Sequence, residues 1–199
     1  MALGYLLSKA SSKLIKTELN IPLALTLSII PDIDIIIPFL EHRGPTHSII
    51  ISTAIFTPIF LIYRKRAIPY FIALNQHFLI GDYLAGSGIQ LLWPATTQYY
   101  GLIMGIKSPT NIAAEWILFI ASMILIYKIK DINSLLQPYN SNLILSIPIF
   151  SVLLPTLLAF PTEVPPALIL PHIILLILFV ISIIIDLRKI LEQAISNIM

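Results

Sequence analysis

Long apolar runs dominate this sequence and restrict what it can fold into. Several of them approach the ~17–25 residues that a helix needs to cross a bilayer. Within lipid, every backbone N–H and C=O must be paired inside the segment, so such runs form helices. We therefore predict an all-α fold, a polytopic membrane helical bundle with about five spanning helices. The runs lie at about 48–63, 67–80, 112–127, 143–160 and 167–185.

Composition supports a membrane protein and excludes some functions. Hydrophobic residues make up 57% of the chain and charged residues 11%, whereas soluble domains carry ~25% charged residues. The net charge of +2 gives no reason to expect nucleic acid as a partner. We expect one compact unit, in which residues 1–130 form a metal-site helical core and residues 131–199 a C-terminal pair of transmembrane helices.

Shorter elements are expected to complete the bundle. Residues 1–16 are expected to form a helix, and the apolar run 21–31 is too short to cross a bilayer alone. These two segments would make a helical hairpin packed against the spans. The glycine-rich loop at 86–88 and the stretch 91–94 are expected to be re-entrant, entering the bilayer only where protein covers them.

Basic residues predict how the bundle is oriented. They lie at alternate ends of successive apolar segments, which is one side of the membrane, and comprise Lys13, Lys16, Arg64, Lys65, Arg66, Lys128, Lys130, Arg188 and Lys189. The positive-inside rule makes that side cytoplasmic. We expect a multi-pass protein of the plasma (inner) membrane.

The ionisable residues of the motifs gather on the opposite, extracytoplasmic side, where Arg43 and Lys107 are the only clearly placed basic residues. The densest group is Pro31-Asp32-Ile33-Asp34 followed by the loop from His42 to Ser48. Ionisable groups at membrane depth are costly and normally face a cavity, a partner or an ion. The candidate metal ligands are Asp32, Asp34, His42, His47, His77, Asp82 and Glu115.

Carboxylates combined with imidazoles favour zinc, with manganese and iron(II) as alternatives. The chain has no Cys, so a thiolate site is excluded. Asp32 and Asp34 are expected in an extended segment that points both carboxylates the same way, with one binding metal and the other orienting a ligand imidazole. Arg43 carries a planar set of donors suited to a phosphate or carboxylate oxygen.

Simpler interpretations exist for each element. The Asp32/Asp34 pair could mark a helix terminus in the interface, and Arg43 could anchor to lipid headgroups. His172, beside Pro171 in the last apolar run, is interpreted as a packing residue. These interpretations leave unexplained why His and acidic residues concentrate on one side, and this favours a metal site.

The motifs resemble a known family. PDID at 31–34, HRGPTHS at 42–48, a His a few residues before an Asp, GIQLLWP at 88–94 and a later Glu occur in the order typical of the membrane-bound metal-dependent hydrolases. Bacterial members of that family include an SOS-regulated inner-membrane protein. The resemblance covers about residues 1–118 and implies that the seven candidate ligands are metal or catalytic positions.

Two positions depart from the family pattern. Family members often carry a His near the N-terminus, where this chain has Tyr5. The family also spaces its later His and Asp four apart, whereas His77 and Asp82 are five apart, about 140° around an ideal helix. A bulged turn at Gly81, or a helix ending before Asp82, would bring both to one ion.

The family is distantly similar to zinc-dependent phospholipase C, and this implies a function. The resemblance implies a phospholipase-like hydrolase in which metal-activated water attacks a phosphoester or ester of a lipid-like substrate. Arg43 would stabilise the developing charge, and Asp34 or Glu115 would accept the water's proton. Membrane lipids are the expected partners. The alternative is a non-catalytic metal-binding membrane protein, as a complex subunit or in ion handling.

Overall fold

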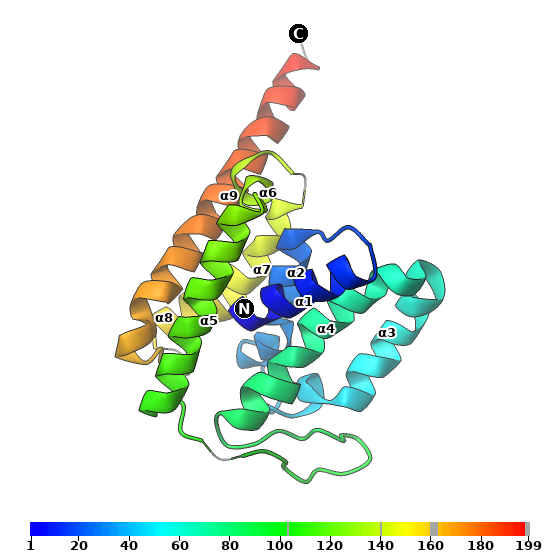
Figure 1. Ribbon diagram of the computed structural model, residues 1–199, viewed down its shortest axis with the longest axis vertical. Coiled ribbons are helices and arrows are strands. Elements are labelled where there is room, and N and C mark those ends of the chain that lie inside the picture. Colours follow the sequence, from blue (N-terminus) through cyan, green and yellow to red (C-terminus); the bar gives the residue numbers. More distant parts are fainter. Residues whose placement is uncertain (103, 140, 160–162, 198–199) are drawn as a thin grey trace.

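The computed structural model describes residues 1–102, 104–139, 141–159 and 163–197, and these residues form an all-α fold (Figure 1). The α-helices are α1 (Ala2–Leu14), α2 (Ile21–Leu27), α3 (Ile49–Tyr63), α4 (Ile68–Gln76), α5 (Pro109–Lys128), α6 (Asn133–Leu136), α7 (Ser146–Pro148), α8 (Leu154–Leu157) and α9 (Ile169–Ser196). Shorter helical turns are η1 (Ile30–Ile35), η2 (Pro45–His47), η3 (Arg64–Ala67), η4 (His77–Asp82), η5 (Asn142–Leu145), η6 (Ile149–Leu153) and η7 (Pro166–Leu168).

Two segments of the described chain are long and apolar enough to cross a membrane, at Pro109–Lys128 and Pro166–Ser196. Only 17% of the most apolar window of each is buried within the protein. Helices that leave most of an apolar surface exposed suit a lipid environment better than a soluble core. The runs predicted at 112–127 and 167–185 therefore form helices of spanning length.

The other three apolar runs form shorter helices. α3 has 15 residues, or about 22 Å at ~1.5 Å per residue, less than the ~30 Å hydrocarbon core of a bilayer. α4 has nine residues before it changes into η4, and residues Asn142–Leu157 make a third short apolar segment. The count of five spans therefore stays a prediction.

The N-terminal hairpin is confirmed as α1 and α2, which pack together and against α4. Gly4 is required at this crossing, because a Cβ added there would collide with the side chain of Ser28. Buried side chains from α1, α2, α5, α6 and α9 meet the segment 142–157 in one hydrophobic core, which contains Tyr5, Ile21, Leu25, Ile126, Leu135, Leu145, Ile149, Leu153 and Phe179.

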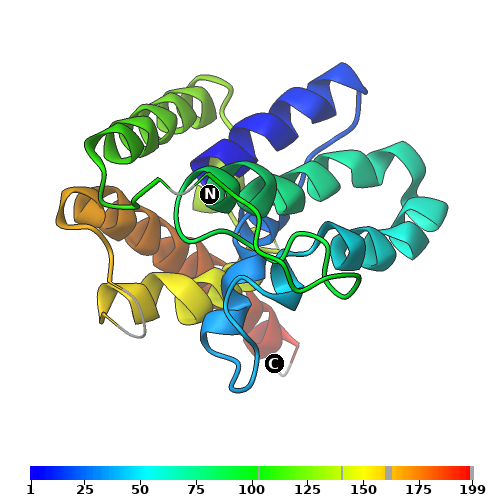
Figure 2. The same cartoon turned by 90° about the horizontal axis from the view of Figure 1, so that it is seen from below.

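The stretch predicted to be re-entrant is a loop. After the helical turn that follows η4, the described residues up to Ser108 contain no helix. Within this loop, Ile89 and Tyr100 pair as an isolated bridge. The loop crosses one end of the bundle (Figures 1 and 2). Ser48, the N-cap of α3, donates to the Trp93 carbonyl at 2.5 Å and fixes the loop there. The stretch is therefore not helical, because its backbone pairs with itself and with the start of α3; its entry into the bilayer stays a prediction.

Candidate metal centre

The five-residue spacing of His77 and Asp82 is accommodated by a π turn. α4 continues at its C-terminal end into η4, a π-helix that spans His77 to Asp82. Because a π turn holds one more residue than an α turn, it returns Asp82 to the side that His77 faces. His77 Nε2 lies 3.1 Å from Asp82 Oδ2. The bulged turn predicted from the sequence is confirmed.

Asp32 and Asp34 do not lie on an extended segment. They belong to η1, a 3₁₀ helix from Ile30 to Ile35 with Pro31 in its first turn. Three residues per turn send side chains two positions apart in different directions. Asp32 faces His77 at 3.1 Å, whereas Asp34 faces the loop that carries His42, at 2.9 Å. The predicted extended segment was wrong, because η1 is a 3₁₀ helix. Both carboxylates nevertheless reach His47, with Asp32 3.4 Å from its Nε2 and Asp34 3.3 Å from its Nδ1. The predicted division into a ligand and an orienting residue fits this arrangement.

Four atoms from three segments converge on one point. They are Asp32 Oδ1, His47 Nε2, His77 Nε2 and Asp82 Oδ2. The four imidazole-to-carboxylate distances are 3.1, 3.1, 3.2 and 3.4 Å. Zinc bonds to N and O of 2.0–2.1 Å place neighbouring ligand atoms of a tetrahedron about 3.3–3.4 Å apart. The spacing therefore fits a cation at the centre of the group.

The imidazole tautomers also fit a cation. Nδ1 of His77 lies 3.1 Å from the Ser28 carbonyl, which can only accept a hydrogen bond. Nδ1 of His47 lies 2.9 Å from the Thr46 hydroxyl and 3.3 Å from Asp34. With the proton on Nδ1, each Nε2 presents a lone pair to the centre. Both Nε2 atoms and Asp82 Oδ2 are buried and have no hydrogen-bond partner, which is the state expected of metal ligands.

Asp34 orients the loop that carries the ligands. Its Oδ1 accepts from His42 Nδ1 at 2.9 Å, and its Oδ2 accepts from the Thr46 hydroxyl at 2.6 Å and the Arg43 backbone at 3.2 Å. Asp32, Asp34 and His42 form a second group of potential ligands, sharing Asp32 with the first. Asp34 thus connects both imidazoles of the HRGPTHS motif to one carboxylate.

Electrostatics at the cluster favour bound positive charge. Burial raises the pKa of Asp34, but hydrogen bonds from two imidazoles and a hydroxyl outweigh it and hold that pKa well below its usual range. Burial lowers the pKa of His47, whereas the adjacent carboxylates of Asp32, Asp34 and Asp82 raise it to about 11. Without a metal, the carboxylates retain a proton on the imidazole in place of a cation.

Arg43 lies beside the cluster. Its Nη2 donates to Asp82 Oδ1 at 2.8 Å, so it holds the carboxylate whose other oxygen faces the centre. Its Nη1 is buried and has no hydrogen-bond partner. The guanidinium packs on Gly86, where any Cβ would collide with it. Arg43 is therefore a ready donor for an oxygen anion next to the metal group.

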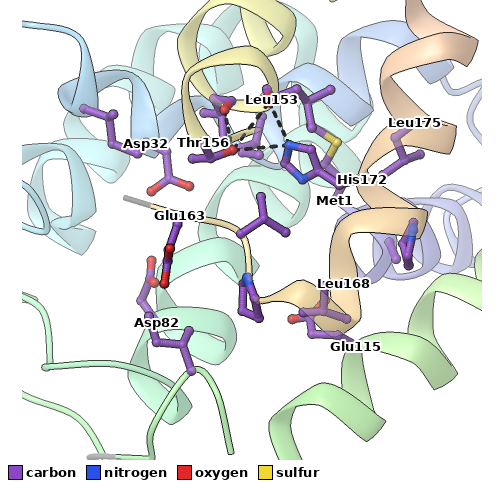
Figure 3. Close-up of a pocket in the computed structure, with 18 of the residues that line it drawn as sticks. Met1, Asp32, Asp82, Glu115, Leu153, Thr156, Glu163, Leu168, His172 and Leu175 are labelled. Atoms are coloured by element: carbon purple, nitrogen blue, oxygen red, sulfur yellow. Dashed lines mark hydrogen bonds between the residues drawn. The ribbon is translucent and has the colours of Figure 1, made fainter. Parts of the chain in front are cut away.

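A cavity of about 360 Å³ opens from the cluster. Asp32 and Asp82 lie on one side of it, and Leu168 and Leu175 lie on the other, with Phe119 in the wall (Figure 3). The cavity is thus polar and acidic where it meets the cluster and apolar toward α5 and α9. Such a division suits an amphiphilic ligand.

The other residues singled out in the sequence lie outside the group of four converging atoms. Glu115 lines the same cavity from α5, apart from Asp32 and Asp82 (Figure 3), and is in neither ligand group. His172 also lines it and hydrogen-bonds the Leu153 carbonyl at 2.8 Å. Tyr5, at the position where the motif resemblance led us to expect a His, is buried and donates to Asp131 at 2.9 Å. Sequence reasoning missed the Ser28 carbonyl, because a backbone acceptor carries no sequence signal.

The fold is all-helical with two helices long and apolar enough to cross a membrane, and its cluster is a His/Asp group that could hold a metal ion. Residues 1–186 match the model of the YdjM inner membrane protein family, and the chain belongs to that family. No curated protein and no solved structure matches the chain. The family match extends well past residue 118, where the resemblance seen in the motifs ended.

Proposed function

We propose that the chain is a multi-pass, inner-membrane, metal-dependent hydrolase that cleaves a phosphoester or ester of a lipid-like substrate at the extracytoplasmic face. The observation that carries the proposal is the buried set of unpartnered His47 and His77 Nε2 atoms facing two carboxylates, at the polar end of a cavity with an apolar wall. The distribution of Lys and Arg supports the choice of side.

Asp32, His47, His77 and Asp82 would hold the metal, with zinc, manganese or iron(II) compatible with the donor set. A bound divalent cation supplies Lewis-acid polarisation and activates water. Arg43 Nη1 binds a non-bridging oxygen of the substrate and offsets the charge that develops there. The guanidinium remains aligned because its Nη2 is held by Asp82.

Asp34 and Glu115 were the two predicted proton acceptors, and their contacts in the structure distinguish between these roles. Both oxygens of Asp34 already accept hydrogen bonds, which supports an orienting role. Glu163 in the cavity wall pairs with Lys107. Glu115 forms no hydrogen bond or ion pair with another described side chain, and its charge acts on the Met1 amino group in the same cavity. We therefore assign it the transfer of a proton between water or substrate and the cavity.

The apolar wall of the cavity supports a lipid-like substrate. Leu168 and Leu175 belong to or adjoin α9, and Phe119 belongs to α5, which are the two segments of spanning length. An acyl chain lying along these helices would leave its headgroup at the cluster. A water-soluble substrate would gain nothing from this wall.

The test is turnover by detergent-purified, metal-loaded protein on a panel of labelled phospholipids and lipid-linked phosphates. We expect Glu115→Gln to retain the metal and lose turnover, whereas His77→Ala loses both. Glu192→Gln, an exposed carboxylate of α9 that pairs with Arg188, is the matched control and should retain both. No product from any lipid, with the metal stoichiometrically bound, would reject the hydrolase.

The alternative is a non-catalytic metal-binding protein. It is favoured by Tyr5, which stands where family members often have a His and is engaged by Asp131 away from the cluster. This function predicts stoichiometric metal, no turnover and no effect of Glu115→Gln in any assay. The lipid panel above therefore separates the two.

A further inference from the structure

A second large groove lies between α2, α3 and α4, away from the metal centre. Its volume is about 580 Å³, larger than the cavity at the cluster. It is lined by the segment before α2, by one face of α3 and by η3 with the first turn of α4. None of its lining residues belongs to the candidate metal groups. The proposed hydrolase leaves this groove without a role.

The groove is divided into a charged end and an apolar length. Glu18 and Arg66 line it where α2 begins, α3 ends and α4 starts. Away from that end it is lined by Leu27 of α2 and Ile55 of α3, which lie further along the two helices. From Tyr63 back to Ile55 is eight residues of helix, or about 12 Å. This length accommodates the first part of an acyl chain.

The charged groups are available for a ligand. Glu18 and Arg66 are exposed and line the same groove, yet they form no ion pair or side-chain hydrogen bond with each other or with any other described residue. Tyr70, which also lines the groove, accepts a hydrogen bond from the Asn20 backbone at 2.8 Å, so its own O–H remains free to donate. One anion-binding group, one cation-binding group and one hydroxyl thus face a common space.

The walls of the groove are held in place by packing. Phe71 of α4 contacts Phe56 and Phe60 of α3, with ring centroids 5.2 and 5.4 Å apart. Offset and edge-on aromatic contacts at such distances stabilise helix pairing. Phe56 is buried, whereas Ile55 on the same face remains 57% exposed. The groove is therefore formed before a ligand arrives, and it is open from the side.

We infer that this groove binds an aminophospholipid, a lipid whose headgroup carries both a phosphate and a primary amine. The Arg66 guanidinium matches the phosphate oxygens, the Glu18 carboxylate matches the ammonium group, and the apolar length between α2 and α3 takes an acyl chain. An anionic lipid without an amine would place negative charge beside Glu18 and leave that carboxylate without a partner. Charge complementarity thus selects the zwitterionic amine-bearing headgroup.

The experiment is native mass spectrometry of the detergent-purified chain with phosphatidylethanolamine, phosphatidylglycerol or phosphatidylcholine of identical acyl chains. We expect phosphatidylethanolamine to be retained most strongly. Losing one charge-assisted hydrogen bond is equivalent to about a tenfold loss of affinity. Arg66→Gln should therefore weaken retention of all three lipids, whereas Glu18→Gln should reduce phosphatidylethanolamine to the level of phosphatidylglycerol.

Two further variants test whether the groove itself is the site. Ile59→Trp fills the apolar length without changing charge and should reduce retention of every lipid. Lys65→Gln changes the net charge as Arg66→Gln does, but Lys65 does not line the groove, so it should have no effect. Equal retention of phosphatidylglycerol, an unaffected Ile59→Trp variant, or equal losses in the Lys65 and Arg66 variants would each overturn the inference.

Discussion

Asp34→Asn offers the sharpest test of the metal centre, because it changes an orienting residue and leaves the four converging atoms in place. Asp34 gives one oxygen to His42 and the other to Thr46 and His47. An asparagine retains only one acceptor oxygen. Whichever way the amide turns, its NH₂ group faces a ring nitrogen or hydroxyl that previously donated to a carboxylate.

The size of the effect follows from this contact. His47 is the one imidazole of the four-atom group that Asp34 orients, because His77 is held by the Ser28 carbonyl instead. Loss of such an outer partner costs about 10–100-fold in metal affinity, or about 1.4–2.8 kcal/mol. Asp32→Asn replaces one of the converging carboxylates with a neutral amide and should cost more.

The assay is a zinc titration in detergent against a chromophoric chelator, comparing Kd for the native chain, Asp34→Asn and Asp32→Asn. Asp131→Asn is the matched control, because Asp131 binds Tyr5 and Lys9 outside the cluster. The control should have the native Kd. A native Kd in Asp34→Asn, or a loss as large as that in Asp32→Asn, would refute the assigned division between ligand and orienting carboxylate.

Three further outcomes are expected. Zinc at about 100 times its Kd should raise the free energy of unfolding by about 2.7 kcal/mol; thermal unfolding in detergent should show this rise in the native chain and not in His77→Ala. Gly86→Ala, whose new Cβ collides with the Arg43 guanidinium, should lower turnover of a phosphoester probe while metal content by mass spectrometry stays native. Phe179→Ala removes a fully buried core ring and should cost about 3–5 kcal/mol of stability, measured by denaturant unfolding, with the zinc Kd of the folded fraction unchanged.

The fold was predictable where the sequence contains a long, uninterrupted apolar run. The runs at 112–127 and 167–185 are apolar throughout, and they form α5 and α9, the two segments of spanning length. The run at 143–160 contains Pro148 and Pro155, which lack a backbone donor. Its described part forms one helical segment, Asn142–Leu157, which changes between 3₁₀, α and π turns and is shorter than a span.

The candidate site was predictable in its members more than in its geometry. His47, His77 and Asp82 were identified because ionisable residues are rare in a strongly hydrophobic chain. The structure brings them together with Asp32. The 3₁₀ conformation of η1 was not predicted, because Pro31 is equally compatible with a helix end and with a first helical turn. Arg43 pairs with Asp82 while Gly86 and Gln90 of the following loop contact it, and no local pattern encodes these long-range contacts.

The π turn from His77 to Asp82 also bears on how relatives of this chain are aligned. A spacing of four on an α turn and of five on a π turn can present a His and an Asp to the same ion. An ungapped alignment would match only one of the two residues and would score the other as lost. A single gap between positions 78 and 81 aligns both His77 and Asp82. The extra residue then counts as an insertion within the helix, and Asp82 counts as retained.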